Sequence, residues 1–354
     1  MTLRSRSSLT KQFGETPVID NMNLDVATGE MIALLGPSGC GKSTTLFAIS
    51  GIHRVDRGQI RIAGQDVTQA CPQERNVGVT FQSYALYPHM TVAQNVGFPL
   101  KVRGETAAEI QRKVAEIAEL VRIDGLLQRK PAELSGGQQQ RVSLARAIVR
   151  RPDVLLMDEP LANLDAGLRI NMRTEIRRIQ KEAGITAILV THDQVEAMSM
   201  CDRIAIMQHG KVVQVDTPVQ MYRNPSSAFV AEFLGNPPIA FLDGIVDAQH
   251  FVSPGARMAF PRGAAPGSGS QAVRVGVRPE HVEVTAEGAN VATVSFIEHQ
   301  GREILYDLQL ANGAVIRTLQ SARSDLRLGE TIRWQVAPEN ILMFDAQGNR
   351  FHVA

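Results

Sequence analysis

Nine consecutive residues near the start of the chain combine glycines, a lysine and hydroxyls in a spacing suited to holding phosphate groups. They fit the pattern G-x-x-x-x-G-K-[ST] and are Gly36, Pro37, Ser38, Gly39, Cys40, Gly41, Lys42, Ser43 and Thr44. Glycines let successive backbone N–H groups turn inward around phosphate oxygens, and a helix start adds positive potential. We therefore expect Lys42 to reach the β- and γ-phosphates of a nucleotide and Ser43 to offer its hydroxyl to Mg²⁺.

Further polar residues follow apolar runs that have the character of buried strands. The run 31–35 leads into the glycine-rich segment, the run 154–157 ends in Asp158 and Glu159, and the run 187–191 ends in His192. Continuous apolar runs of this length are typical of strands in a parallel sheet that is covered on both faces. Between the last two runs, apolar residues recur at helical spacing, so strand, helix and strand are predicted to form a parallel crossover.

In a parallel sheet of this kind, ligands bind outside the carboxyl ends of the strands. The glycine-rich loop, the two carboxylates, the histidine and also Gln82, which follows the apolar segment 77–81, are predicted to meet at that edge. Phosphoryl transfer requires a cradle, a lysine, a hydroxyl and a carboxylate for the metal, a group that polarises water, and a sensor of the γ-phosphate. The combination favours nucleotide hydrolysis or transfer over a purely structural explanation of each residue.

A second helix start of similar chemistry lies further along the chain. The segment LSGGQ contains Ser135, Gly136, Gly137 and Gln138 and precedes a helix with apolar positions at Val142, Ala145 and Ile148. Taken alone, a serine and two glycines before a helix more often form a simple cap. Such a start can nevertheless hold an anion. Together with an amphipathic helix predicted over 105–121, it indicates a helical subdomain at about residues 85–152.

Composition excludes several other classes of protein. The chain has 354 residues, enough for about two domains, and its formal charge of +1 gives no reason to expect nucleic acid as a partner. Three cysteines, Cys40, Cys71 and Cys201, lack metal-site spacing, which favours a reduced cytosolic protein without disulfides. The sequence has neither a signal-peptide core nor a run of eighteen apolar residues, so we expect a chain that neither spans a membrane nor is exported.

The character of the sequence changes after the helix stop and stiff linker at 234–238. Short strand patterns separated by turns such as Asn312-Gly313 recur, and the alternation over 304–310 predicts one strand face. We therefore predict a domain boundary between residues 235 and 236, with an all-β, OB-like barrel over 236–354. The Pro/Gly/Ala/Ser stretch 261–270 is expected to be a flexible loop, and Trp334, the only tryptophan, is expected in the core.

With these motifs in this order, the chain resembles the ATP-binding subunit of an ABC importer, in particular the carbohydrate-importer group that includes the maltose and glycerol-phosphate ATPases. The resemblance covers nearly the whole chain and is carried by the loop 36–44, the LSGGQ segment and Asp158-Glu159-Pro160. It implies a P-loop NTPase fold and a role for each matching residue. These are Phe13 stacking on adenine, Gln82 as a metal and partner sensor, Asp158 and Ser43 as magnesium ligands, Glu159 as general base, Asp165 in the D-loop, and His192 on the γ-phosphate.

The resemblance also implies cofactors, partners and a location. ATP and Mg²⁺ would be bound, two copies would dimerise on ATP, and Ser135 to Gln138 would face the nucleotide of the partner copy. Hydrolysis would drive uptake of a sugar, polyol or sugar derivative through two transmembrane permease subunits, which dock near residues 82–88 and are served by an external solute-binding protein. The chain would then be a peripheral protein on the cytoplasmic face of the inner membrane. The segment 273–281 resembles the C-terminal regulatory domain of the same importers.

Two departures and several alternatives accompany this interpretation. Ala162 stands where the family often has serine, and residues 2–9 make a poor first strand. A soluble P-loop enzyme such as a small-molecule kinase would need a substrate lid and an acceptor site. An ABC ATPase of DNA repair or translation would be expected to carry a coiled-coil insert or a second cassette. An importer of another small solute is a further alternative, since the membrane subunits and the binding protein choose the cargo.

Overall fold

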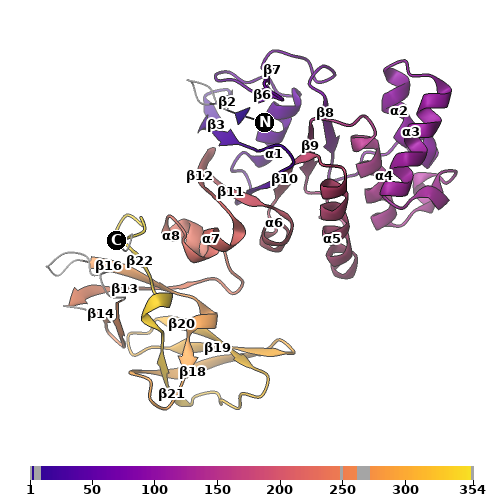
Figure 1. The fold of residues 1–354 in the computed structure, drawn as a ribbon. Coiled ribbons are helices and arrows are strands. Elements are labelled where there is room, and N and C mark those ends of the chain that lie inside the picture. Colours follow the sequence, from indigo (N-terminus) through magenta and orange to yellow (C-terminus); the bar gives the residue numbers. More distant parts are fainter. Residues whose placement is uncertain (1, 4–8, 248–249, 261–271, 352–354) are drawn as a thin grey trace. The chain divides into compact units, whose positions relative to one another are not determined.

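The computed structural model describes residues 2–3, 9–247, 250–260 and 272–351, so the loop expected at 261–270 lies outside the described residues. The chain divides into two compact units, Met1–Met221 and Tyr222–Ala354 (Figure 1). Among the described residues, no helix has both the length and the hydrophobicity that crossing a membrane requires.

The first unit is organised around a six-stranded sheet with the strand order β12-β11-β5-β10-β9-β8. Neighbouring strands are parallel from β8 to β11, and β12 is antiparallel at the edge. β5 and β10 are buried at every position, as their continuous apolar runs predict. The strands are β5 (Met31–Leu35), β8 (Val77–Thr80), β9 (Val154–Asp158), β10 (Thr186–Thr191), β11 (Arg203–Gln208) and β12 (Lys211–Asp216).

Helices of this unit begin at the carboxyl ends of the strands. α1 (Lys42–Ser50) follows β5, α5 (Ala166–Glu182) follows β9, and α6 (Gln194–Met200) follows β10. Smaller antiparallel elements flank the sheet, among them a hairpin in which β6 pairs with β7. They are β1 (Thr2–Leu3), β2 (Leu9–Phe13), β3 (Thr16–Met22), β4 (Leu24–Asp25), β6 (Arg61–Ile62) and β7 (Gln65–Asp66), and α7 (Pro218–Arg223) follows β12.

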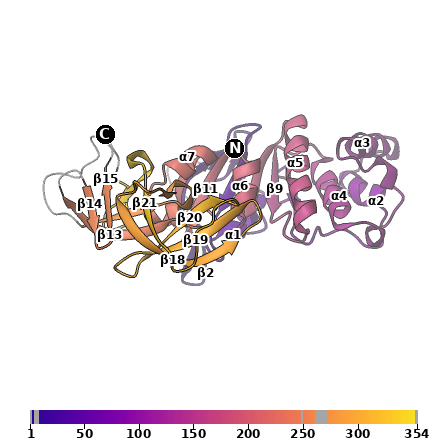
Figure 2. The same cartoon turned by 90° about the horizontal axis from the view of Figure 1, so that it is seen from below.

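Three helices form the expected helical subdomain and appear as one group in Figures 1 and 2. They are α2 (Val92–Val102), α3 (Ala107–Leu120) and α4 (Gly136–Ile148). Each starts with a capping box, in which a serine or threonine and a side chain three residues later satisfy each other's backbone N–H groups. The helices α3 and α4 match their sequence predictions, whereas α2 was not predicted.

The second unit contains two five-stranded antiparallel sheets around one core, which confirms the predicted barrel-like all-β domain. Trp334, Tyr306 and Phe251 are fully buried there. One sheet has the strand order β15-β14-β13-β16-β22 and the other has β17-β21-β18-β19-β20. Their bounds are β13 (Ala240–Asp247), β14 (His250–Ser253), β15 (Ala256–Ala259), β16 (Ala272–Val277), β17 (Glu283–Val284), β18 (Asn290–His299), β19 (Glu303–Gln309), β20 (Val315–Ser321), β21 (Thr331–Gln335) and β22 (Leu342–Phe344).

The division between the units lies earlier in the chain than the predicted boundary at 235/236. The short helix α8 (Ala228–Phe233) packs Ala228 and Ala231 against Ile239, Leu342 and Phe344, which all belong to the second unit. The backbone of Ala228 also donates a hydrogen bond to the Gly348 carbonyl. The apolar face of α8 thus packs in a small cluster with residues of the second unit, although its position before a Pro-rich linker had suggested the end of the first domain.

Candidate nucleotide-binding site

The glycine-rich loop joins β5 to α1 and lies against the backbone of two other strands. A Cβ at position 36 would overlap the carbonyl oxygen of Met207 in β11, and one at position 41 would overlap that of Val18 in β3. Gly41 also has a φ of 101°, in the left-handed region that favours glycine. The glycines of the motif therefore let the loop approach its neighbours closely, which brings its backbone N–H groups to the edge of the sheet.

Lys42 lies across this loop. Its Nζ donates hydrogen bonds to the carbonyl oxygens of Gly36 at 2.7 Å and Pro37 at 2.9 Å, and the residue is only 7% exposed. Cys40 is also buried, and burial raises the pKa of its thiol despite the nearby Lys42 charge. The thiol is therefore protonated at neutral pH, and Lys42 is the charged group of the loop.

Ser43 and Asp158 bring two oxygen ligands together from different elements. The Ser43 hydroxyl, at the start of α1, donates a hydrogen bond of 3.0 Å to Asp158 Oδ1 at the end of β9. Burial raises the pKa of Asp158, and the adjacent Glu159 charge adds to this effect, while the Ser43 hydrogen bond and Lys42 oppose it. A desolvated carboxylate beside a hydroxyl is a donor set that fits a hard divalent cation such as Mg²⁺.

Glu159 and His192 form a pair at the ends of neighbouring strands. His192 Nδ1 lies 3.0 Å from Glu159 Oε1, and the Glu159 N–H donates to the Val190 carbonyl at 2.9 Å. Glu159 has a φ of 43°, a left-handed conformation that a residue with a side chain adopts rarely and mostly at functional sites. Both residues line a cavity of about 60 Å³, which has room for water beside the carboxylate.

The turn 162–165 follows Glu159 in the chain and contacts or contains two further predicted site residues, Gln82 and Asp165. Asn163 Nδ2 donates a hydrogen bond of 2.8 Å to the Gln82 carbonyl, which places the exposed Gln82 next to the turn. Asp165 Oδ1 accepts from the Leu168 N–H at 2.9 Å and so caps α5. Ala162 lines the same cavity as Glu159 and His192.

Phe13 is the predicted adenine-stacking residue, and its ring is exposed. It ends strand β2, is 49% exposed and contacts His53 edge to face with ring centroids 5.4 Å apart. The Lys11 ammonium lies 5.1 Å from the ring centroid. The exposed ring thus contacts both Lys11 and His53, and His53 is a neighbour that the sequence did not indicate.

The LSGGQ segment forms the start of α4. Ser135 and Gln138 complete a capping box, with the Ser135 N–H donating to Gln138 Oε1 at 2.9 Å. A Cβ at position 136 would lie 3.1 Å from Leu164 Cδ2, and one at position 137 would lie 3.8 Å from Leu168 Cδ2 and 3.9 Å from Met172 Sδ. Within one chain, this helix start therefore packs against the turn 162–165 and the start of α5.

Polar residues on either side of His192 form hydrogen bonds around the start of α6. Asp193 and Glu196 have the spacing of a capping pair, and Asp193 Oδ1 does cap α6 by accepting from the N–H groups of Val195 and Glu196. The Glu196 carboxylate does not return to the Asp193 N–H, because both groups bind the Thr191 hydroxyl instead, at 2.7 Å and 3.0 Å. Arg169, which lines the same cavity, was missed because no motif marks it.

Comparison with known proteins gives matches over both units. The model of the family described as ABC transporter matches residues 19–162, and that of the TOBE domain matches residues 275–344. The sn-glycerol-3-phosphate import ATP-binding protein UgpC of Ruegeria sp. (strain TM1040) is 44% identical over 342 residues, covering 96% of each chain. The lactose transport ATP-binding protein LacK of Rhizobium radiobacter is 41% identical over 358 residues, covering 97% of this chain and 98% of LacK.

A solved structure supports the same assignment. The dimeric structure of a post-hydrolysis state of the ATP-binding cassette MJ0796, bound to ADP and Pi, matches with a TM-score of 0.54 and 29% identity. It covers 62% of this chain and 99% of the MJ0796 chain. The resemblance inferred from the motifs is therefore confirmed by family model, by full-length relatives and by fold. The chain belongs to the ABC transporter family, as one of its ATP-hydrolysing nucleotide-binding subunits.

Proposed function

We propose that this chain is the ATPase subunit of an importer for a sugar, a polyol or a sugar derivative. The observation that carries the proposal is the arrangement at one edge of the sheet, where Lys42, the Ser43–Asp158 pair and the Glu159–His192 pair lie at successive strand ends. The cargo class is supported by two relatives that match nearly the full length of the chain, one named for sn-glycerol-3-phosphate import and one for lactose transport.

Each residue of this edge has a task in hydrolysis. Lys42 and the backbone of the loop 36–44 bind the phosphates, and Phe13 stacks on the adenine. Ser43, Asp158 and Gln82 would hold Mg²⁺, which would supply positive charge to the phosphate oxygens. Glu159 accepts the proton of the attacking water, and His192 holds Glu159 on one side and the γ-phosphate on the other. Asp165 fixes the end of the turn 162–165 by capping the start of α5.

The active assembly is a homodimer with membrane partners. Ser135 to Gln138 form a capped helix start that can hold an anion, and we assign it to the nucleotide of a second copy. The MJ0796 structure, which is dimeric and bound to ADP and Pi, is consistent with this arrangement. Two transmembrane permease subunits dock near residues 82–88 on the cytoplasmic face of the inner membrane, and an external solute-binding protein acts through them.

Glu159→Gln tests the catalytic assignment. Loss of the carboxylate removes the base, so the activation free energy of hydrolysis should rise by about 3 kcal/mol and turnover should fall accordingly. ATP affinity should be retained, because Lys42, Ser43 and Asp158 still hold the nucleotide. Steady-state ATPase and equilibrium ATP binding are measured on the same preparation. Unchanged turnover would remove Glu159 from the mechanism, and joint loss of binding and turnover would point to a folding defect.

Mixed dimers test whether two copies share each site. In the assembled transporter, Lys42→Ala and Ser135→Arg are placed either on opposite subunits or together on one. If sites are shared, the opposite arrangement damages one site twice and leaves the other whole, whereas the joint arrangement damages both. Higher ATPase from the joint arrangement would contradict shared sites. Because coupling between sites can lower both rates, the ranking of the two arrangements decides the result.

We also propose that the second unit is an autonomous regulatory module. Truncation after Asn224 removes α8 together with the core that covers it, and should leave ATP binding largely intact. Truncation after Gly235 keeps α8 but removes Ile239, Leu342 and Phe344, which cover its apolar face. The longer fragment should therefore aggregate more, as light scattering would show. A soluble, folded 1–224 fragment that cannot bind ATP would contradict the proposed autonomy.

A further inference from the structure

Arg169 joins two turns beside the Glu159–His192 pair. It lies in the first turn of α5, and its Nη2 donates a hydrogen bond of 3.2 Å to the Leu164 carbonyl. Its Nη1 lies 3.6 Å from Asp193 Oδ2, and its side chain lines the same cavity of about 60 Å³. The Nε of Arg169 is buried and has no hydrogen-bond partner among the described residues, so the guanidinium is held by this one hydrogen bond and this ion pair.

One end of this bridge holds the segment that carries His192. Asp193 follows His192 directly and uses its Oδ1 to accept from the Val195 and Glu196 N–H groups, which leaves Oδ2 for Arg169. On the other side of His192, the Thr191 hydroxyl accepts from the Asp193 N–H at 3.0 Å. The backbone around His192 is thus fixed at both neighbouring residues, and Arg169 is the cation of that arrangement.

The other end of the bridge holds the turn 162–165. Leu164 is buried, and its side chain packs where Gly136 leaves space at the start of α4. In the same turn, Asn163 donates to the Gln82 carbonyl. The turn therefore contacts both the LSGGQ helix and the residue that follows β8, and Arg169 connects these contacts to the histidine segment.

We propose that Arg169 is a positioning residue, which sets the alignment of His192 with Glu159 by tying the turn 162–165 to the segment 191–193. The planar guanidinium can donate to a carbonyl and a carboxylate at once, which an ammonium group does less well. A partly exposed ion pair at 3.6 Å contributes little to stability. A small displacement of a reacting group, in contrast, lowers turnover strongly, so the main effect of Arg169 is on rate. This inference rests on the roles proposed for Glu159 and His192.

Arg169→Gln in the purified full-length chain tests the proposal, with Arg173→Gln on the next turn of α5 as the matched control. Arg169→Gln should lower kcat about tenfold and change the KM for ATP less than about twofold, with a Tm equal to that of the control. Arg169→Lys, which keeps the charge but not the fork, should stay below about half of the wild-type kcat. Wild-type kcat in Arg169→Lys would overturn the bridging role.

Asp193→Asn supplies a double-mutant cycle, because asparagine caps a helix as well as aspartate does but carries no charge. If Arg169 acts through Asp193, adding Arg169→Gln to the Asp193→Asn variant should lower kcat by less than about twofold more. Independent, multiplicative losses would overturn the proposal. So would a kcat for Arg169→Gln equal to that of Arg173→Gln, or a loss accompanied by a lower Tm and weaker ATP binding, which indicates a structural role.

Failure of this inference can be distinguished from failure of the proposed function. If Glu159→Gln leaves turnover unchanged, the assignment of the base is wrong whatever Arg169 does. If Glu159→Gln abolishes turnover and Arg169→Gln behaves like its control, only the positioning role of Arg169 is wrong.

Discussion

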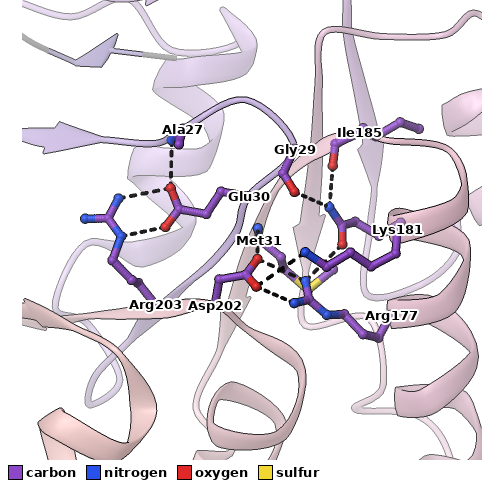
Figure 3. A network of polar contacts seen from close by, with 10 residues as sticks. Ala27, Gly29, Glu30, Met31, Arg177, Lys181, Ile185, Asp202 and Arg203 are labelled. Atoms are coloured by element: carbon purple, nitrogen blue, oxygen red, sulfur yellow. Dashed lines mark hydrogen bonds and ion pairs between the residues drawn. The ribbon is translucent and has the colours of Figure 1, made fainter.

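The two edges of the central sheet use charged residues in opposite ways. At the amino edge, shown in Figure 3, each carboxylate meets a guanidinium: Glu30 accepts two hydrogen bonds from Arg203, and Asp202 accepts from Arg177 and from the Met31 N–H. At the carboxyl edge, Asp158 is adjacent to Glu159, and among the described residues its carboxylate accepts a hydrogen bond only from the Ser43 hydroxyl. The carboxylates of the amino edge are thus paired with arginines, whereas among the described residues neither Asp158 nor Glu159 forms an ion pair with an arginine or a lysine.

Two aspartates show the consequence for pKa. For Asp202, burial acts to raise the pKa, but hydrogen bonds from Arg177 and Met31 and the nearby charges of Arg177 and Lys181 outweigh it and lower the pKa to about 2. For Asp158, burial raises the pKa and Glu159 adds to the shift. The ionised form is thus stabilised at the amino edge and penalised at the carboxyl edge. A carboxylate whose ionised form is penalised in this way is suited to binding a cation from outside.

Asp158→Asn should give the largest effect. Turnover should fall by about 10²–10³-fold because the proposed metal ligand is lost. Stability at neutral pH should not fall, since a carboxylate with a raised folded-state pKa costs stability when it is ionised. ATPase assays and thermal unfolding at pH 7 measure both quantities. A marked drop in Tm would show that Asp158 is a structural residue like Asp202, and would remove the contrast between the edges.

Arg203→Met should lower stability and leave turnover unchanged, which is the reverse of the effect expected for Asp158→Asn. It leaves Glu30, which is 9% exposed, as a buried carboxylate without its guanidinium, so the free energy of unfolding should fall by about 1–3 kcal/mol. The kcat should stay at the wild-type value. Lys211→Met, which removes the exposed partner of Asp20, is the matched control and should cost less than about 0.5 kcal/mol. Equal losses in the two variants would contradict the structural role of the amino edge.

The smallest expected effect is the loss of the Asp202 contribution to stability at acid pH. Because the folded-state pKa of Asp202 is lowered from 3.8 to about 2, its stabilisation is present above pH 4 and is lost as the pH falls toward 2. Since a third of the side chain is exposed, the contribution at neutral pH is about 1 kcal/mol. Denaturant unfolding of the wild type and of Asp202→Asn at pH 7, 4 and 3 measures it. A difference that stays constant down to pH 3 would contradict the assignment.

The sequence predicted those parts of the molecule that depend on local pattern. β5 and β10 are continuous apolar runs, and Lys42, Asp158 and His192 stand at strand ends or helix starts. Both the sheet and the polar residues at the carboxyl ends of its strands could therefore be predicted. The helix α2 was missed because Gly97 and Pro99 interrupt its helical pattern. Partners fixed by strand order were also missed, since Glu30 and Arg203 are 173 residues apart and meet only because β11 lies beside β5.

The backbone contacts of the glycine-rich loop determine how its variants should be interpreted. At position 36 an alanine is excluded by the Met207 carbonyl in β11, and not by a ligand, so loss of activity in Gly36→Ala reports a displaced strand. Gly39 has a φ of 79° with open space around its Cβ position, so a side chain there strains only the local backbone. A glycine-to-alanine change therefore tests the packing of the loop against β11 at position 36, whereas at position 39 it tests only the local backbone of the loop.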